Sequence, residues 1–193
     1  MFTVPENASK CTNVYDALME RGFIEQCTDP EAVRKMLSEE KIKFYIGFDA
    51  TADCLHVGHL IQVIVFLWML KYGHTPVVLI GGGTTMVGDP SGRTDMRKVM
   101  TTDTIDDNCK AFKELFDRFL PFDEEWKYEG NKGVFVPGHQ NKEPEPGKCV
   151  TVNNAEWLRP LNYIEFVKEI GSKFNVKEML RADCFKRRME EGG

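Results

Sequence analysis

Residues 45–59 read YIGFDATADCLHVGH, in which an apolar strand is followed by a turn of Gly, Asp, Ala and Thr and then by two histidines around a glycine. A strand, a turn and a helix start in this order form a nucleotide site, because the first N–H groups of a helix are unpaired and its dipole attracts phosphate. His56 and His59 are three residues apart, so they share one face of the helix. Gly58 has no Cβ, which lets a flat group such as a purine approach the backbone.

The sequence on both sides of this segment predicts a strand–helix–strand unit. Residues 43–48 are β-like, and Asp53 is the predicted N-cap of a helix that runs through LIQVIVFLWMLKY to Gly73. This helix is apolar nearly all round, so we expect it to be buried in the core. Residues 76–80 read PVVLI, a β-branched run typical of a strand buried on both faces of a parallel sheet. The crossover should be right-handed.

The remaining sequence predicts helices around this unit. Asn13 and Asp29 are expected N-caps of two helices in an N-terminal helical segment, residues 1–38. From Thr104 onward, apolar residues recur at helical spacing. The Gly/Pro/Lys/Glu-rich residues 123–151 predict an inserted surface loop in a second region, residues 39–193. Further helices are expected over residues 163–170, after Asn175 and over residues 182–190.

Composition excludes several classes of protein. The chain has 193 residues, 42% of them hydrophobic and 28% charged, which is ordinary for a globular domain. Its net charge of −5 argues against a free-standing nucleic-acid binder. The apolar run Leu60–Leu70 is too short to span a bilayer, and no charged-then-apolar leader opens the sequence, so we expect a cytoplasmic protein without membrane contact. The six cysteines are scattered without a Cys-x-x-Cys pair, so we expect neither a metal site nor disulfides.

A second segment, GGGTTMVGDPSGRTDMR at residues 81–97, follows the PVVLI strand. It fails the dinucleotide fingerprint because Met86 occupies the third glycine position, and it fails the P-loop because Asp89 stands where lysine is needed. A carboxylate would repel phosphate, so Asp89 is interpreted as a ligand for a cation such as a substrate ammonium group. Arg93 and Arg97 follow and could cover an anion. Together the two segments predict a site for an amino acid and a nucleoside triphosphate.

These residues resemble the catalytic domain of bacterial-type tyrosyl-tRNA synthetases, a class I family, over residues 14–191. Residues 45–59 resemble its HIGH signature, and residues 81–97 resemble its tyrosine-site loop, which is the more specific match. A third similar stretch is VNNAEWLRPLNYIEFVKEIGSKFNVKEML, residues 152–180. The resemblance implies an α/β fold, a Rossmann-like parallel sheet with helices on both faces. It also implies that tyrosine and ATP react to tyrosyl-adenylate, that tyrosine then passes to tRNA(Tyr), that Mg²⁺ arrives with ATP, and that the protein is a homodimer.

The resemblance also implies roles for individual residues. The positions implied for tyrosine are Tyr45 at the phenol, Asp89 at the ammonium group and Asn153 near the reacting region. The positions implied for the phosphates and the departing pyrophosphate are Thr51, His56, Arg93 and Arg97. The positions implied around the adenosine and its phosphates are Gly47, Asp49, Gly58 and His59. His74 and His139 are interpreted as structural.

The sequence departs from the family in two ways. The loop over residues 123–151 is longer than usual, and the sequence stops before the later tyrosine-site helix, the KMSKS loop and the anticodon-binding region. We therefore expect an N-terminal portion of the catalytic domain, incomplete at its C-terminal end and weak or inactive alone. One alternative is a module that binds nucleotide or tyrosine without turnover. A nicotinamide dehydrogenase is a third hypothesis, which Met86 and Asp89 disfavour.

Overall fold

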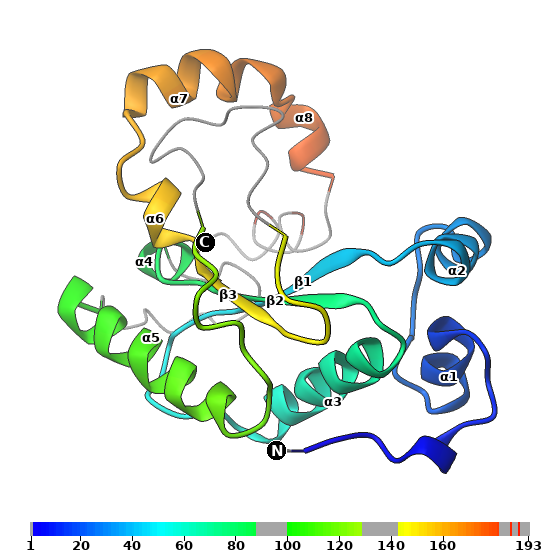
Figure 1. Cartoon of the computed structure of the whole chain (residues 1–193). Helices are drawn as coiled ribbons and strands as arrows, with labels where there is room; N and C mark the ends of the chain where they lie inside the picture. Colours follow the sequence, from blue (N-terminus) through cyan, green and yellow to red (C-terminus); the bar gives the residue numbers. More distant parts are fainter. Residues whose placement is uncertain (1, 88–99, 129–142, 182–185, 187–188, 190–193) are drawn as a thin grey trace.

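The computed structural model describes residues 2–87, 100–128, 143–181, 186 and 189 (Figure 1). Its centre is a three-stranded parallel sheet in the order β1 (Lys43–Phe48), β2 (Thr75–Ile80) and β3 (Val150–Asn153). Helix α3 (Val57–Lys71) connects β1 to β2 and packs with α5 (Thr102–Asp117) on one face of this sheet. The predicted α/β class and the strand–helix–strand unit are confirmed.

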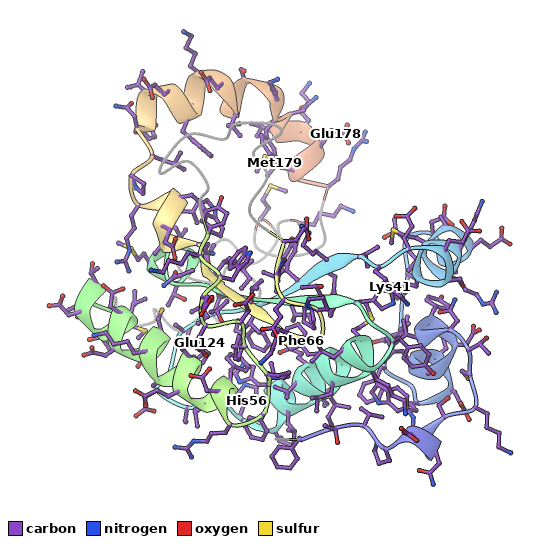
Figure 2. The ribbon with its side chains drawn as sticks, in the orientation of Figure 1. Lys41, His56, Phe66, Glu124, Glu178 and Met179 are labelled. Atoms are coloured by element: carbon purple, nitrogen blue, oxygen red, sulfur yellow. The ribbon has the colours of Figure 1, made fainter. Side chains whose placement is uncertain are left out.

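Two hydrophobic cores hold these layers together. The larger one lies between the sheet and helices α3 and α5, and Figure 2 places Phe66 between α3 and the strands. The smaller core joins α1 (Val14–Glu20) and α2 (Pro30–Glu39) to the other side of α3. Because α3 is covered from two sides, its middle and last turns are buried, as at Val63 and Met69.

The capping residues and the apolar spacing in the sequence predicted most helix starts correctly. Asn13 caps α1, since its side-chain oxygen accepts the Tyr15 N–H at 2.7 Å, and Asp29 caps α2 by accepting the Ala32 N–H at 3.0 Å. Helix α5 begins two residues before the predicted Thr104. The other helical elements among the described residues are η1 (Glu6–Ala8), α4 (Thr84–Val87), α6 (Ala155–Leu158), α7 (Tyr163–Glu169), η2 (Gly171–Lys173) and α8 (Val176–Met179).

The prediction for α3 was wrong in two respects. Its N-cap is His56 and not Asp53, because the His56 ring accepts the N–H of Gly58. Val57 and Ile61 in the first turns are also exposed, at 79% and 53%, since neither side chain belongs to a hydrophobic core. The start of α3 is therefore an open surface beside the turn that follows β1.

The expectation that β2 is buried on both faces was also wrong. Residues along β2 alternate: Pro76, Val78 and Ile80 are buried under the helices, whereas Val77 and Leu79 are only half-buried on the opposite face. A strand places successive side chains on opposite faces, so this alternation means that one face of the described sheet is incompletely covered. In addition, β3 begins at Val150, inside the predicted loop 123–151.

The division into residues 1–38 and 39–193 stays a prediction. Helices α1 and α2 pack on α3. The predicted helix over residues 182–190 lies almost wholly outside the described residues. None of the helices in the described part of the chain is both long and apolar enough to cross a membrane.

His74 is buried where α3 leads into β2, as predicted for a structural histidine. Its side chain is 1% exposed and its Nδ1 accepts the Ile42 N–H at 3.3 Å, while Nε2 has no hydrogen-bond partner among the described residues. Desolvation by burial, together with the nearby Lys41 charge, lowers the pKa of His74. The folded protein thus favours the neutral ring more than the unfolded chain does.

Stability should therefore fall in mild acid because of His74. The unfolded chain takes up its proton first, at about pH 6.5, so the contribution of neutral His74 is complete above that pH and is lost as the pH falls towards the lower folded-state pKa. The substitution His74→Asn keeps an acceptor near Ile42 but does not titrate in this range. Urea unfolding should show that the free energy of unfolding falls more between pH 7.5 and pH 5.5 in wild type than in the variant. Equal decreases would contradict the role given to His74.

Candidate active site

Hydrogen bonds join the carboxyl ends of all three strands. The Thr84 hydroxyl, just after β2, donates to Asp49 Oδ1, just after β1, at 2.9 Å. The Gly82 N–H donates to Asn153 Oδ1, at the end of β3, at 3.2 Å. Asn154 accepts the Gly83 N–H at 2.6 Å and donates to the Thr84 hydroxyl at 3.0 Å. Ligands bind at this edge in open parallel sheets, so the network lies where a ligand site is expected.

The turn after β1 is held from two sides. The Ala50 N–H donates to the Thr85 hydroxyl at 3.0 Å, and the Ala50 carbonyl accepts from Asn108 Nδ2, on α5, at 2.9 Å. The Gly81 N–H donates to the Phe48 carbonyl at 2.8 Å. With its backbone groups held in this way, the turn keeps Asp49 and Thr51 exposed at the same edge.

His56 and His59 cap the start of α3 reciprocally. His56 Nδ1 accepts the Gly58 N–H at 3.1 Å, and His59 Nδ1 accepts the His56 N–H at 3.2 Å. The two rings stack, with centroids 3.8 Å apart and an interplanar angle of 20°. Because each Nδ1 accepts, each neutral ring carries its proton on Nε2. Two Nε2–H donors are thereby left at an exposed helix start, labelled at His56 in Figure 2.

The surroundings of His59 favour its neutral form. Its ring makes T-shaped contacts with the rings of Phe48 and Phe112, with centroids 5.7 and 5.8 Å away. Burial lowers the pKa of His59, and the neighbouring His56 lowers it further when that ring is charged. Neutral His59 keeps the acceptor that caps α3, so the same packing preserves both the cap and the Nε2–H donor.

Gly58 is required here for a reason that the sequence did not reveal. A Cβ at this position would lie 2.9 Å from Cε1 and 3.0 Å from Nδ1 of the His56 ring. A side chain would thus displace the imidazole that caps the helix. The predicted approach of a purine to this glycine stays a prediction.

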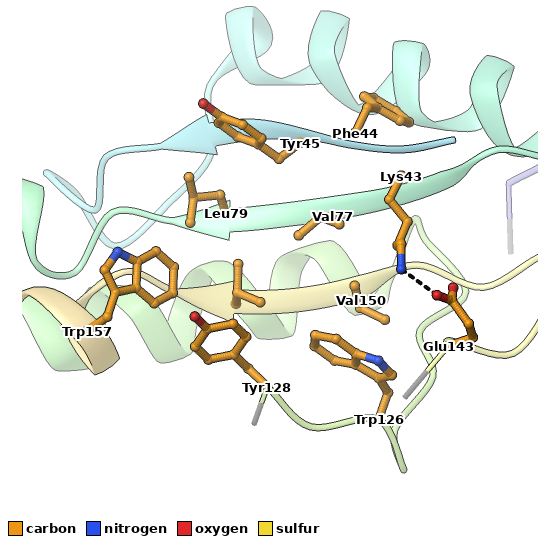
Figure 3. Close-up of a pocket in the computed structure, with 11 residues that line it drawn as sticks. Lys43, Phe44, Tyr45, Val77, Leu79, Trp126, Tyr128, Glu143, Val150 and Trp157 are labelled. Carbon is orange, nitrogen blue, oxygen red and sulfur yellow. Dashed lines mark hydrogen bonds and ion pairs between the residues drawn. The ribbon is translucent and has the colours of Figure 1, made fainter. Parts of the chain in front are cut away.

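Tyr45 and Gly47 lie on the incompletely covered face of β1, where Tyr45 is 69% exposed. Tyr45 lines a pocket of about 660 Å³ (Figure 3). The sheet side of this pocket is apolar, with Val77 and Leu79 from β2. The full lining is Lys43, Phe44, Tyr45, Val77, Leu79, Trp126, Tyr128, Glu143, Val150, Val152 and Trp157.

An ion pair supports the backbone between β2 and α4. Arg159 donates to both carboxylate oxygens of Asp106, at 2.6 and 3.1 Å, and to the Gly82 carbonyl at 3.3 Å. The hydrogen bonds from Arg159 lower the pKa of Asp106, so this carboxyl is ionised at neutral pH. The pair joins α5 to the segment after α6 and holds Gly82 beside Asn153.

The predicted site residues fall into two groups. Those that the structure brings to the carboxyl edge or to the adjoining face are Tyr45, Gly47, Asp49, Thr51, His56, Gly58, His59 and Asn153. Asp89, Arg93 and Arg97 lie outside the described residues, so their predicted convergence with His56 is not tested. Sequence reasoning missed Thr84, Asn108, Asn154, Arg159, Trp126, Tyr128 and Trp157. Of these, only Asn154 could have been found from the sequence, because it forms a polar pair with Asn153 at the end of a strand.

The chain is similar in sequence to known proteins. The family model for tRNA synthetases class I (W and Y) matches residues 37–193. A tyrosine–tRNA ligase of Clostridium botulinum (strain Hall) is 49% identical over 181 residues, which are 94% of this chain and 39% of that relative. A tyrosine–tRNA ligase of Clostridium kluyveri is 47% identical over 180 residues, 93% of this chain and 39% of the relative. The chain thus spans 39% of the length of these curated relatives.

Two solved structures are similar to the fold. A C-terminally truncated mitochondrial tyrosyl-tRNA synthetase of Aspergillus nidulans superposes with a TM-score of 0.74 at 26% identity, over 96% of this chain and 49% of that chain. The corresponding truncated protein of Coccidioides posadasii gives a TM-score of 0.67 at 25% identity, over 96% of this chain and 47% of that chain.

Proposed function

We propose that this chain, which belongs to the class I tRNA synthetases (W and Y), supplies the ATP- and tyrosine-binding part of a tyrosine–tRNA ligase. In the reaction, the tyrosine carboxylate attacks the α-phosphorus of ATP, a new C–O–P linkage forms and pyrophosphate leaves. Tyrosine then passes from the adenylate to tRNA(Tyr). No protein nucleophile is needed, so catalysis consists of positioning the two substrates and stabilising the charge that develops on the phosphates.

The observation that carries this proposal is the reciprocal histidine cap. A helix start already favours phosphate, and in the described part of the chain the two caps use only Nδ1 of His56 and His59, so the Nε2–H groups can donate to phosphate oxygens. Thr51 lies at the same edge and is exposed. Arg93 and Arg97 are proposed, from the family resemblance, to neutralise the departing pyrophosphate.

ATP and Mg²⁺ are proposed to bind together. Magnesium keeps several of its waters and is usually held through substrate phosphates with one or two carboxylates. The imidazole and hydroxyl donors described at this edge suit a phosphate chain, and the Asp49 carboxylate suits an Mg²⁺ ion that is held mainly through those phosphates. When bound, the ion would neutralise phosphate charge. The chain's own residues would orient the phosphates and the adenosine, with Gly47 and Gly58 giving close access to the backbone.

Tyrosine is proposed to enter the pocket at Tyr45. The apolar wall of Val77 and Leu79 suits an aromatic ring, and the Tyr45 hydroxyl supplies a polar partner for the substrate phenol. Asp89 is proposed to bind the ammonium group and Asn153 to lie near the carboxylate. The orientation that follows brings the carboxylate towards the carboxyl edge of the sheet, where the phosphates are proposed to bind.

The resemblance supports binding to tRNA(Tyr), a cytoplasmic location and pairing with a second copy of the chain. For the pairing, α7, η2 and α8 offer exposed apolar side chains, among them Tyr163, Ile164 and Phe174 at 75%, 68% and 61% exposure. Sedimentation equilibrium measures whether the chain dimerises.

Calorimetry and pyrophosphate exchange together test the proposal. The 193-residue chain should bind Mg²⁺–ATP and L-tyrosine, and binding of neither would refute the proposed function. Tyrosine-dependent exchange of pyrophosphate into ATP separates an active portion from a module that binds without turnover.

The substitution His56→Asn isolates the proposed phosphate donor. Asparagine is a good N-cap and keeps an acceptor for the Gly58 N–H, but it lacks the imidazole Nε2–H. Loss of a hydrogen bond to a charged group should weaken Mg²⁺–ATP binding by about 10- to 100-fold. L-Tyrosine affinity and thermal stability should stay near the wild-type values. Unchanged ATP affinity would remove His56 from the phosphate site.

A further inference from the structure

The pocket at Tyr45 is not built by the sheet alone. Its lining includes Trp126 and Tyr128 from one arm of the long connection between α5 and β3, and Glu143 from the returning arm. At about 660 Å³ it lies in the range of pockets that hold drug-sized ligands, which exceeds what one phenol ring requires. The connection therefore contributes walls to the pocket, and these walls limit what can fit.

The first arm directs two aromatic rings to the same side. Trp126 and Tyr128 are half-buried, whereas Lys127 between them is exposed. This alternation is that of an extended segment, in which every second side chain shares a face. Figure 3 shows both rings on the side of Val150, facing the pocket across from Tyr45.

The two arms are tied together at their base. The Asp123 N–H donates to the Cys149 carbonyl at 2.9 Å, and the Cys149 N–H donates to the Pro121 carbonyl at 2.7 Å. Asp123 also accepts the Glu145 N–H through Oδ2 at 2.9 Å, and the Trp126 N–H through Oδ1 at 3.1 Å. These bonds hold the described parts of both arms together at Cys149, the residue just before β3.

The walls are also fastened at each end of the pocket. Near the carboxyl edge, the Tyr128 ring packs on Trp157, just after β3, with centroids 5.2 Å apart at 54°. At the other end, Lys43 pairs with Glu143 at 2.7 Å, although both side chains are exposed, so the pair adds little stability. The Tyr128–Trp157 contact is consequently the stronger support for the wall.

We propose that Tyr128 and Trp126 determine the size of the aromatic side chain that the pocket accepts. This inference rests on the proposed tyrosine site, and it assigns a specificity role to a segment outside both signature sequences. Tyr128 and Trp157 border the pocket across from Tyr45, so an aromatic side chain that contacts Tyr45 points towards this wall, and the larger indole of tryptophan extends further towards it than a phenol does. Trp126 closes the pocket beyond Tyr128.

Calorimetry of the 193-residue chain with L-tyrosine and L-tryptophan tests the role of the wall. Tyr128→Ala should weaken L-tyrosine binding by about tenfold, the equivalent of one lost aromatic contact, and should improve L-tryptophan binding relative to L-tyrosine. Trp126→Ala should shift the ratio of the two dissociation constants in the same direction. Lys127→Ala is the matched control, because its side chain is exposed between the two rings, and should leave the ratio unchanged.

The outcomes separate this inference from the proposed function. If wild type binds no L-tyrosine, the proposed function fails. If wild type binds L-tyrosine but Tyr128→Ala and Trp126→Ala weaken both amino acids by the same factor, or weaken neither, the specificity role is refuted. Should Tyr128→Ala fail to fold, Tyr128→Leu retains an apolar contact with Trp157 and should still lower the preference for L-tyrosine. Tyr128→Phe keeps the ring and should keep the wild-type preference.

Discussion

Replacing Phe112 by alanine is expected to lower the free energy of unfolding by about 3–5 kcal/mol. Phe112 is 1% exposed and is one of the largest fully buried side chains in the core between α5 and the sheet. It packs against Phe116 with centroids 6.3 Å apart at 87°, and against His59 at 5.8 Å. Alanine would remove the ring and leave a cavity that the surrounding strands and helices fill only in part.

The substitution should also affect the nucleotide site. His59 would lose one of the rings that hold it, so the reciprocal cap of α3 should loosen and Mg²⁺–ATP affinity should fall. Urea unfolding followed by circular dichroism measures the stability, with Phe174→Ala as the matched control. Phe174 is 61% exposed, and its removal should change stability by less than about 0.5 kcal/mol. A loss below about 1 kcal/mol in Phe112→Ala would contradict the packing described.

Replacing Gly81 by alanine should cost about 1–3 kcal/mol, because it inserts a methyl group into a filled space. An added Cβ would lie 2.5 Å from Asp49 Oδ1, 2.8 Å from Thr84 Oγ1 and 3.1 Å from the Phe48 carbonyl oxygen. The two side chains can move, but the carbonyl belongs to β1 and accepts the N–H of Gly81 itself. Relief of the collision should therefore separate Asp49 from Thr84 and disturb the junction of β1 and β2.

Gly171→Ala is the matched control for this prediction. Among the described residues, a Cβ at Gly171 would meet Val167 alone, at 3.7 Å or more, which is ordinary van der Waals contact. Thermal unfolding should show a clear loss for Gly81→Ala and almost none for Gly171→Ala. Calorimetry should show weaker ligand binding only for Gly81→Ala. Equal behaviour of the two variants would mean that the Asp49–Thr84 contact is not as close as the structure has it.

Much of the fold could be predicted because its signals are local. Asn13 and Asp29 cap helices through N–H groups within three residues, and the run at residues 76–80 has the composition of a parallel strand wherever it occurs. The N-cap of α3 was harder to predict from the sequence. Asp53 has the usual chemistry of an N-cap, whereas the observed cap depends on two stacked imidazoles that support each other.

The candidate site shows the same division between local and distant contacts. His56, Gly58 and His59 are close in sequence, so their spacing alone indicated a shared ligand. Arg159 and Asp106 are 53 residues apart, and Thr84 and Asn154 are 70 apart, so no pattern in the sequence pairs them. Trp126 and Tyr128 fall in a stretch whose composition predicts only a surface loop.

By itself the sequence determined β1, β2, the helix between them and the two motifs that carry the family resemblance, because periodicity, capping and short motifs act over a few residues. Only the tertiary structure decided which face of β2 stays open, which oxygen atoms hold Gly82 and Gly83, and which aromatic rings border Tyr45. Those features depend on how the strands and helices pack, and packing brings together residues whose separation along the chain carries no information about their contact.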